Sequence, residues 1–198
     1  MPSVITIDSI KPNATVSTTF VVRGTFDPGY AVVPPVACTL TRPGLANAIM
    51  PSVPVVTSGS TYWAYFDGVP ANNQYQVESD LRQGNQTVAG SIVGNLTVAD
   101  NDPDITTNTP NTGDQVAAAG FQASGTYLIS ADPNPSGLFT LYDGKGGLLQ
   151  QIKVPLGGGN WSVTFTAIPP GVNYRLLAEL LSGGFSVAAD LATNLTAQ

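Results

Sequence analysis

FVVRGTF at residues 20–26 and FQASGTY at residues 121–127 decide how this chain is organised. Each stretch has an aromatic residue, three intervening residues, Gly-Thr and a second aromatic residue in the same order. A phrase that returns at a long fixed distance is typical of a repeated structural unit. The two stretches therefore predict that one module occurs twice.

The match extends along most of the 198 residues. At the same spacing, CTLT at 38–41 falls on FTLY at 139–142. After a two-residue adjustment, the equivalent stretches are YWAYF at 62–66 with WSVTF at 161–165, and NLT at 95–97 with NLT at 194–196. Each copy has roughly 100 residues, which is enough for one compact hydrophobic core.

Short alternating runs separated by turn residues make up each copy. In NWSVTFT, residues 160–166, Trp161, Val163 and Phe165 point to one side of a strand and Ser162 and Thr164 to the other. No stretch sustains the apolar period of 3.6 that a helix requires. The pattern predicts an all-β chain in which each copy is a β-sandwich.

SGTY at 124–127, GLFTLYDGKGG at 137–147, the run at 157–180 and NLTA at 194–197 resemble a bacterial immunoglobulin-like module. The resemblance covers residues 105–198 well and residues 4–99 more loosely. It implies two tandem immunoglobulin-like sandwiches of about seven strands each, with Greek-key connections and no disulfide. The predicted domains are residues 1–99 and 105–198, joined by a short acidic linker at 100–104.

Tyr75 and Tyr174 each open the penultimate strand of a copy, four or five residues after a proline. This placement resembles a tyrosine corner, in which the hydroxyl bonds back to nearby backbone and fixes a loop. We therefore expect both tyrosines to be structural.

The composition excludes several kinds of chemistry. The chain has no histidine and one cysteine, Cys38, so it contains no Ser-His-Asp or Cys-His machinery, no zinc site and no intrachain disulfide. Cys38 aligns with Phe139 and is expected to be a small buried hydrophobe. The two glutamates, Glu78 and Glu179, lie one in each copy and are both expected to point outward, so they cannot form a glycosidase pair within one module. We expect no enzyme activity and no cofactor.

The charges argue against two further classes of partner. Thirteen acidic residues outnumber seven basic ones, and neither half carries a basic stripe that would neutralise phosphates. No run of about 18 apolar residues exists to cross a membrane. We therefore expect neither nucleic-acid binding nor membrane insertion.

Asp100, Asp102 and Asp104 lie at alternate positions of the junction between the copies. Carboxylates so spaced are typical of calcium-stiffened linkers, because Ca²⁺ prefers six to eight oxygen ligands. Asp, Asn and Pro are equally typical of a solvated hinge. A plain hinge is the favoured interpretation, and a calcium site at these three aspartates is the alternative.

Three kinds of function fit a non-catalytic tandem. The first is a tailed-bacteriophage virion accessory protein, a capsid decoration or fibre subunit that contacts capsid subunits or copies of itself. The second is a segment of a bacterial surface adhesin or spacer array, and the third is a carbohydrate-binding module that contacts host-surface glycans. The N-terminus MPSVITIDSIKPNATV lacks the basic and apolar regions of a secretory signal peptide, which favours the virion over the bacterial surface.

Arg23, Trp63 and Tyr65 are the candidate partner-binding residues. Alternation turns Trp63 and Tyr65 away from the core side of their strand, and Arg23 is expected beside them on the neighbouring strand. Two aromatic rings and an arginine on one face have the composition of a binding hot spot. A register slip of one residue would instead turn the rings inward, and residues 43–60 could form a loop that covers them.

Overall fold

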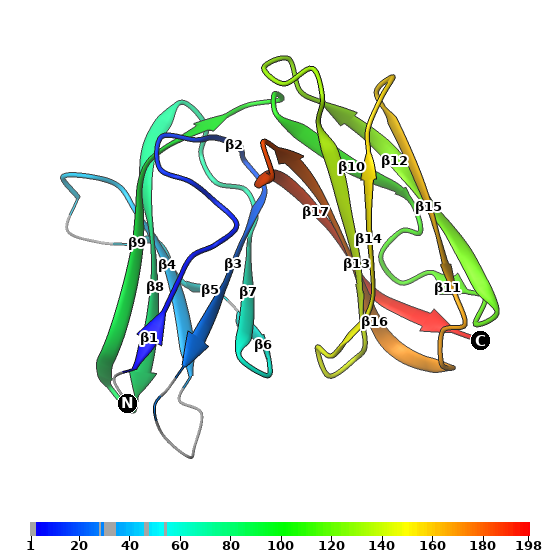
Figure 1. The fold of residues 1–198 in the computed structure, drawn as a ribbon, viewed down its shortest axis with the longest axis horizontal. Helices are drawn as coiled ribbons and strands as arrows, with labels where there is room; N and C mark the ends of the chain where they lie inside the picture. The colour runs from blue at the N-terminus through cyan, green and yellow to red at the C-terminus, as the bar shows by residue number, and fades with distance from the viewer. Residues whose placement is uncertain (1–2, 28, 30–34, 46–47, 54) are drawn as a thin grey trace. The chain divides into compact units, whose positions relative to one another are not determined.

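The computed structural model describes the chain apart from residues 1–2, 28, 30–34, 46–47 and 54 (Figure 1). The chain forms two compact units: unit 1, Met1–Asp100, and unit 2, Asn101–Gln198. All the regular secondary structure of the described residues is β. Within them, no helix has the length and apolar character needed to cross a membrane.

Unit 1 is a sandwich of two sheets, with strand orders β1-β3-β7-β6 and β2-β9-β8-β4-β5. The strands are β1 (Val4–Ile5), β2 (Thr15–Ser17), β3 (Phe20–Asp27), β4 (Val36–Thr41), β5 (Ala48–Val53), β6 (Val55–Ser58), β7 (Thr61–Phe66), β8 (Asn73–Gln83) and β9 (Gln86–Ala99).

Unit 2 has a three-stranded sheet, β10-β12-β15, and a five-stranded sheet, β11-β17-β16-β13-β14. The strands are β10 (Asp104–Thr109), β11 (Gln115–Val116), β12 (Gly120–Leu128), β13 (Ser136–Tyr142), β14 (Leu148–Pro155), β15 (Asn160–Thr166), β16 (Gly171–Ser182) and β17 (Phe185–Ala197).

Both units have the strand order of an immunoglobulin-like sandwich, so the predicted all-β tandem fold is confirmed. In each unit the first strand is divided between the two sheets. Its second half, β2 or β11, pairs in parallel with the last strand, β9 or β17. This division adds one strand to each unit beyond the seven or so predicted, and unit 1 has a further described strand because β5 and β6 lie in different sheets.

Alternation along the strands builds one core in each unit. The core of unit 1 is centred on Phe20, Phe66, Leu40 and Tyr75, and Phe20 stacks on Phe66 with ring centroids 5.1 Å apart. In unit 2, Phe121 and Phe165 make the corresponding contact, with centroids 5.3 Å apart. Each unit therefore buries its own apolar side chains between its own two sheets.

The repeated Gly-Thr pair has a steric cause. A Cβ on Gly24 would lie 1.8 Å from the carbonyl oxygen of Thr6 and 2.7 Å from the ring of Tyr62. A Cβ on Gly125 would meet the carbonyl of Thr106 and the ring of Trp161 at the same two distances. Glycine is needed at both sites because the first strand and an aromatic ring approach the backbone too closely for any side chain.

The same two carbonyls accept hydrogen bonds from the rings that crowd the glycines. Tyr62 donates its hydroxyl to the carbonyl of Thr6 at 2.6 Å, and Trp161 donates Nε1–H to the carbonyl of Thr106 at 3.0 Å. The two copies thus use different aromatic residues to hold the first strand on the sandwich.

Both tyrosine corners are present. Tyr75 donates its hydroxyl to the carbonyl of Pro70 at 2.7 Å, and Tyr174 donates to the carbonyl of Pro169 at 2.6 Å. Both side chains are buried in their cores. The structural role expected for these residues is confirmed.

Candidate binding face

The sheet register places Trp63 and Tyr65 on the side of β7 that faces away from the core of unit 1. Their neighbours Tyr62, Ala64 and Phe66 all belong to that core. Since successive side chains of a strand alternate between the two faces, Trp63 and Tyr65 lie on the opposite face.

Arg23 lies directly beside these rings. In the antiparallel pairing of β3 with β7, Arg23 is opposite Trp63 and Val21 is opposite Tyr65. Val56 of β6 is the partner of Trp63 on its other side. We call the surface formed by Val21, Arg23, Val56, Trp63 and Tyr65 the β3–β7 outer face.

Burial differs across this face. Trp63 and Val21 are buried, whereas Arg23, Tyr65 and Val56 are half-buried. Part of the segment 43–60, for which a covering loop was the alternative interpretation, forms β6, which lies beside β7 in the same sheet. Residues 46–47 and 54 of that segment lie outside the described residues. The role of Arg23, Trp63 and Tyr65 in binding stays a prediction.

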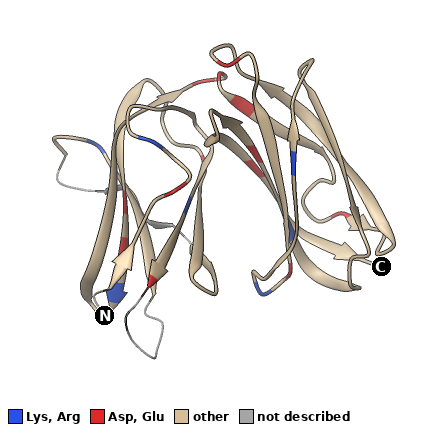
Figure 2. Ribbon diagram, viewed as in Figure 1, with Lys and Arg blue, Asp and Glu red and all other residues tan. Residues whose placement is uncertain are grey.

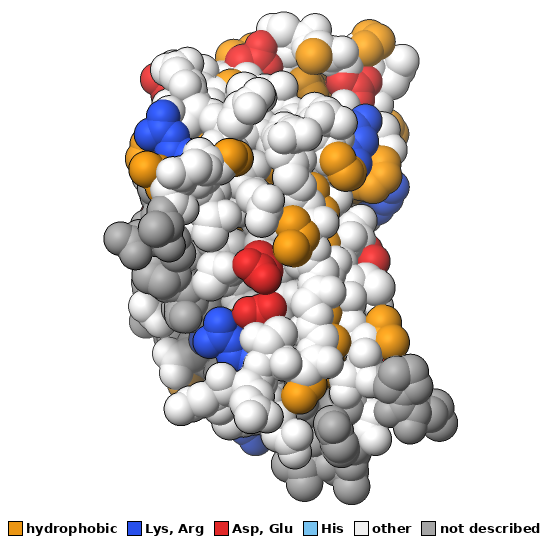
Figure 3. All heavy atoms as spheres, turned by 90° about the vertical axis from the view of Figure 1, so that its left-hand side faces the viewer, with side chains coloured by type: hydrophobic (Ala, Val, Ile, Leu, Met, Phe, Trp, Pro, Cys, Tyr) orange, Lys and Arg blue, Asp and Glu red, His pale blue; other side chains and the backbone are white. Residues whose placement is uncertain are grey.

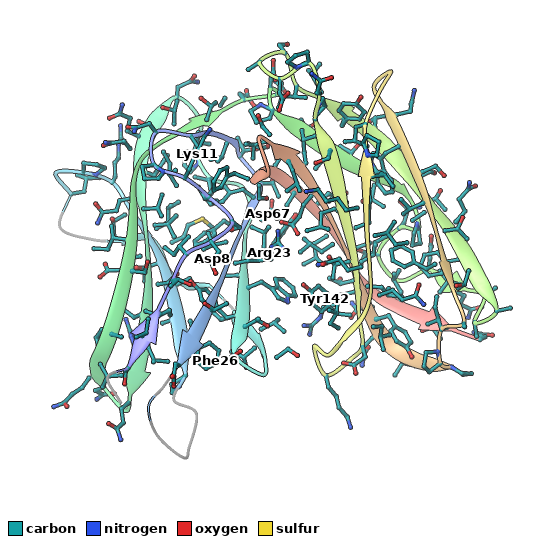
Figure 4. All side chains as sticks on the ribbon, viewed as in Figure 1. Asp8, Lys11, Arg23, Phe26, Asp67 and Tyr142 are labelled. Carbon is teal, nitrogen blue, oxygen red and sulfur yellow. The ribbon has the colours of Figure 1, made fainter. Side chains whose placement is uncertain are left out.

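The segment after β1 fixes the backbone beneath Arg23. Asp8 donates its backbone N–H to the carbonyl of Arg23 at 2.8 Å, and Arg23 donates its own N–H to Ser9 Oγ at 2.7 Å. The Ser9 hydroxyl in turn donates to the carbonyl of Val21 at 3.4 Å. Figure 4 marks Asp8 on this segment and Arg23 on β3. No pattern in the sequence predicts this support, because it depends on where the segment crosses β3.

Unit 2 has the same frame with different side chains. Ser124 is opposite Ser162 and Gln122 is opposite Thr164, in the register that joins Arg23 to Trp63 and Val21 to Tyr65. Ser162, Thr164 and Gln122 are exposed and Ser124 is half-buried. The backbones of the two copies therefore match, and the aromatic and cationic character of the β3–β7 outer face comes from side chains alone.

In the part of the chain that the structure describes, the other charged side chains do not gather with aromatic rings as Arg23 does on the β3–β7 outer face. Lys and Arg lie at separate places on the ribbon (Figure 2), and the side of unit 1 that carries β8 and β9 mixes acidic, basic and apolar groups (Figure 3). An ion pair on β8 joins Arg82 to Asp80 at 3.2 Å. Among the described residues, none of these places has the basic stripe that nucleic acid requires.

The three junction aspartates have separate environments. Asp100 is exposed. Asp102 accepts the backbone N–H of Ser130 at 3.0 Å. Asp104 begins β10, and burial together with the charge of Asp190 raises the pKa of its carboxyl. Among the described residues, no group of three or more His, Cys, Asp or Glu side chains is placed to hold a metal ion. Asp102 thus has a structural role within unit 2.

Glu78 and Glu179 lie on the outer side of their sheets, as alternation predicts. Glu78 is opposite Ile92, and Glu179 is opposite Leu138 and Ala189, and these three described neighbours lie outside the core clusters. Glu78 is half-buried, but Glu179 is fully buried, which the sequence did not indicate.

Cys38 lies in the core of unit 1, as expected for a small hydrophobe. Its Sγ is 3.3 Å from Ser79 Oγ, and burial raises the pKa of the thiol from 9.0 to about 11. A thiol so shielded is a poor nucleophile, because the thiolate is the reactive form.

No protein-family model matches the chain, and no curated protein matches it. Solved structures with a similar arrangement include a chimeric titin Z1Z2 carrying a KLER peptide from decorin, at 16% identity and a TM-score of 0.35, covering 98% of this chain and 96% of that one. Titin Z1Z2 in complex with telethonin has 16% identity and a TM-score of 0.29 over 98% and 96% of the two chains. Rst D1-D2 has 9% identity and a TM-score of 0.32 over 100% of both chains. Function has to be argued from this chain's own residues.

Proposed function

We propose that this protein is a non-catalytic structural and binding protein that contacts another protein through the β3–β7 outer face. The observation that carries the proposal is that the two units have the same strand register but different side chains on this face. Where unit 1 has Arg23, Trp63 and Tyr65, unit 2 has Ser124, Ser162 and Thr164 at the same register. The aromatic side chains are not needed to form the sandwich, because unit 2 forms it without them.

The chemistry of this face suits a protein partner. Tryptophan, tyrosine and arginine are enriched among binding hot spots. The flat aromatic rings bury much area at low entropic cost. Arg23 also adds a cation to an otherwise uncharged set of side chains, which would favour an acidic or carbonyl-rich contact on the partner. On this sheet face Arg23 and Tyr65 are half-buried and Trp63 is buried, so a partner would first contact Arg23 and Tyr65.

The setting that we propose is the surface of a tailed-bacteriophage virion, as a capsid decoration or fibre protein. Its support is that residues 105–198, and residues 4–99 more loosely, resemble a bacterial immunoglobulin-like module of the kind found in phage decoration proteins and in surface adhesins, together with the lack of residues for catalysis. A bacterial surface adhesin or spacer is the alternative setting. Immunogold electron microscopy of the native source, with an antibody against this protein, distinguishes the two. We expect label on virus particles, and label confined to bacterial surfaces would contradict the virion proposal.

The binding face is tested with matched variants. The double variant Trp63→Ser, Tyr65→Thr gives unit 1 the side chains of unit 2, and Gln122→Ala, Ser124→Ala changes the equivalent face of unit 2 as a control. We expect the first variant to fold, as judged by near-ultraviolet circular dichroism, and to lose attachment to particles in a co-sedimentation assay. The control should attach normally.

Two results would overturn this assignment. If the Trp63 and Tyr65 variant attaches as well as the wild type, the face does not bind the particle. If the variant misfolds, the rings are structural. A glycan array tests for a carbohydrate ligand. If the wild type binds immobilised sugars and the same variant does not, the face binds carbohydrate.

A further inference from the structure

Within the fully described unit 2, no strand covers the outer edge of strand β15. β15 (Asn160–Thr166) is the last strand of the sheet β10-β12-β15 and, among the described residues, pairs only with β12. All of unit 2 is described, and no strand of it pairs with the other edge of β15. An unpaired edge offers a row of backbone N–H and C=O groups to another strand.

The free groups can be assigned to particular residues. Gly159 accepts the N–H of Tyr127 at 2.9 Å, so odd-numbered positions direct their backbone groups toward β12. Thr166 instead receives the side-chain amide of Gln150, whose Oε1 accepts the Thr166 N–H at 3.3 Å. Because the direction alternates along an antiparallel strand, Ser162 and Thr164 direct their N–H and C=O to the open edge.

Unit 1 shows what normally occupies this position. There β7, the equivalent of β15, is covered by β6, which pairs Val55 with Ala64 and Thr57 with Tyr62. In unit 2 the equivalent residues Val154 and Pro155 belong to β14, in the other sheet. The Gln150 amide covers the end of the edge at Thr166, and within the fully described unit 2 the middle of β15 has no equivalent of β6.

The edge of β15 also lacks the features that discourage pairing. The strand NWSVTFT has no charged residue and no proline, and its register with β12 runs without a bulge. The other edge strands of unit 2 are each protected: β14 contains Lys153, Pro155 and a register shift, β10 contains a register shift, and β11 has two residues. Charges, prolines, bulges and shortness are the usual means of blocking edge-to-edge association.

We propose that the β15 edge binds a second copy of this chain by antiparallel strand addition. In the two-fold arrangement, Val163 lies at the axis and Ser162 of one copy lies opposite Thr164 of the other. The two three-stranded sheets then form one continuous sheet. A second copy fits because the strand is neutral, so self-pairing opposes no like charges, and because its free donors and acceptors at positions 162 and 164 are self-complementary. This proposal is independent of the β3–β7 outer face.

A charge exchange in the full-length protein tests the register. In the double variant Ser162→Lys, Thr164→Lys, like charges face each other twice across the two-fold pair. In Ser162→Lys, Thr164→Glu, opposite charges face each other twice. From the usual strength of cross-strand pairs, the first variant should weaken the dimer roughly two- to thirtyfold and the second should restore it or strengthen it. Sedimentation equilibrium over a wide concentration range measures both.

A backbone change provides the second test. Thr164→Pro removes a donor that faces the open edge but no bond to β12, so the fold should survive, whereas the dimer should be lost. Thr164→Val keeps the donor and is the matched control, with the dimer retained. Circular dichroism confirms that each variant is folded.

Three outcomes would overturn the proposal: a wild-type protein that stays monomeric up to its solubility limit, a folded Thr164→Pro variant that dimerises as well as Thr164→Val, or equal dimerisation of the two charged variants. If Thr164→Pro does not fold, the comparison of the charged variants decides alone. A wild-type dimer that dissociates only in the Trp63 and Tyr65 variant would assign self-association to the other face and also overturn it.

Discussion

Single residues explain why the two copies share their Gly-Thr phrase. Gly24 and Gly125 are repeated because a carbonyl oxygen of the first strand occupies the place of their side chain. Cys38 and Phe139, by contrast, occupy equivalent core positions with different volumes. Both copies therefore keep the close approach of the first strand's carbonyl to the glycine, whereas the volumes of the surrounding core side chains differ.

Replacing either close-approach glycine should be strongly destabilising. In Gly24→Ala or Gly125→Ala the new Cβ meets backbone, which cannot move aside as a side chain would. We expect the free energy of unfolding of the affected unit to fall by about 3 kcal/mol or more. Gly94→Ala is the control, since a Cβ there would have only Gln76 Oε1 near it, at 3.9 Å. Urea titration followed by circular dichroism measures all three, and equal stabilities would refute the steric explanation.

Cys38 gives a prediction about pH. The folded thiol has a pKa of about 11 against an ordinary value of 9.0, so above pH 9 the unfolded chain loses a proton that the folded chain keeps. The stability contributed by Cys38 is thus fully present below pH 9 and is lost as the pH rises toward 11. Between these values the free energy of unfolding should fall by about 1.4 kcal/mol per pH unit. In Cys38→Ala this component of the slope should disappear, and an unchanged slope would assign it to other groups.

The same burial predicts how the thiol reacts. In the folded protein near neutral pH, Cys38 should react with DTNB only as fast as unit 1 opens. In denaturant it should react completely and at once. Rapid labelling of the native protein would show that the side chain is accessible.

At the scale of strands and loops, side-chain hydrogen bonds to backbone carbonyls connect the elements of each sandwich. The tyrosine corners join the loop before β8 or β16 to the strand itself through Tyr75 and Tyr174. The ring hydrogen bonds to Thr6 and Thr106 attach the first strand. These contacts link segments that are separate in the sequence or lie across a turn, and they recur in both units.

Removing a corner hydroxyl should cost a modest, equal amount in each unit. Tyr75→Phe and Tyr174→Phe keep the buried ring but leave the carbonyl of Pro70 or Pro169 without its donor. We expect a loss of about 1–2 kcal/mol in the free energy of unfolding. Tyr127→Phe is the control, because Tyr127 is a half-buried tyrosine packed against the core of unit 2 outside the corner. A loss in the control as large as in the corners would show that the hydrogen bonds are not the cause.

Over the full length of the chain, each unit has its own core and its own fastened first strand. Residues from Asp102 onward already take part in unit 2, through the bond from Ser130 to Asp102 and the start of β10 at Asp104. This arrangement is what independent folding of the two modules would require.

We therefore expect residues 1–100 and 101–198, produced separately, each to fold and to unfold in one cooperative transition. Near-ultraviolet circular dichroism and thermal melts of the two fragments check this. A fragment without fixed tertiary signals would show that its core depends on the other unit.

Local order along the chain was enough to predict the repeat, the all-β class, the tyrosine corners and the faces of β7 on which Tyr62 and Trp63 lie. Alternation, turn residues and spacing are properties of the chain before it folds, so these features can be read from neighbouring residues.

The other features required the folded arrangement, because each of them joins residues that are distant in the sequence. The need for Gly24 comes from a carbonyl eighteen residues earlier, at Thr6, and from the ring of Tyr62. The support of Arg23 by Ser9 depends on where one segment crosses another. The open edge of β15 depends on Val154 and Pro155 joining β14 in the other sheet. The similar sequence of unit 1 does not predict that its corresponding edge is covered by β6. Strand partners are chosen by competition among long-range contacts, which local pattern does not encode.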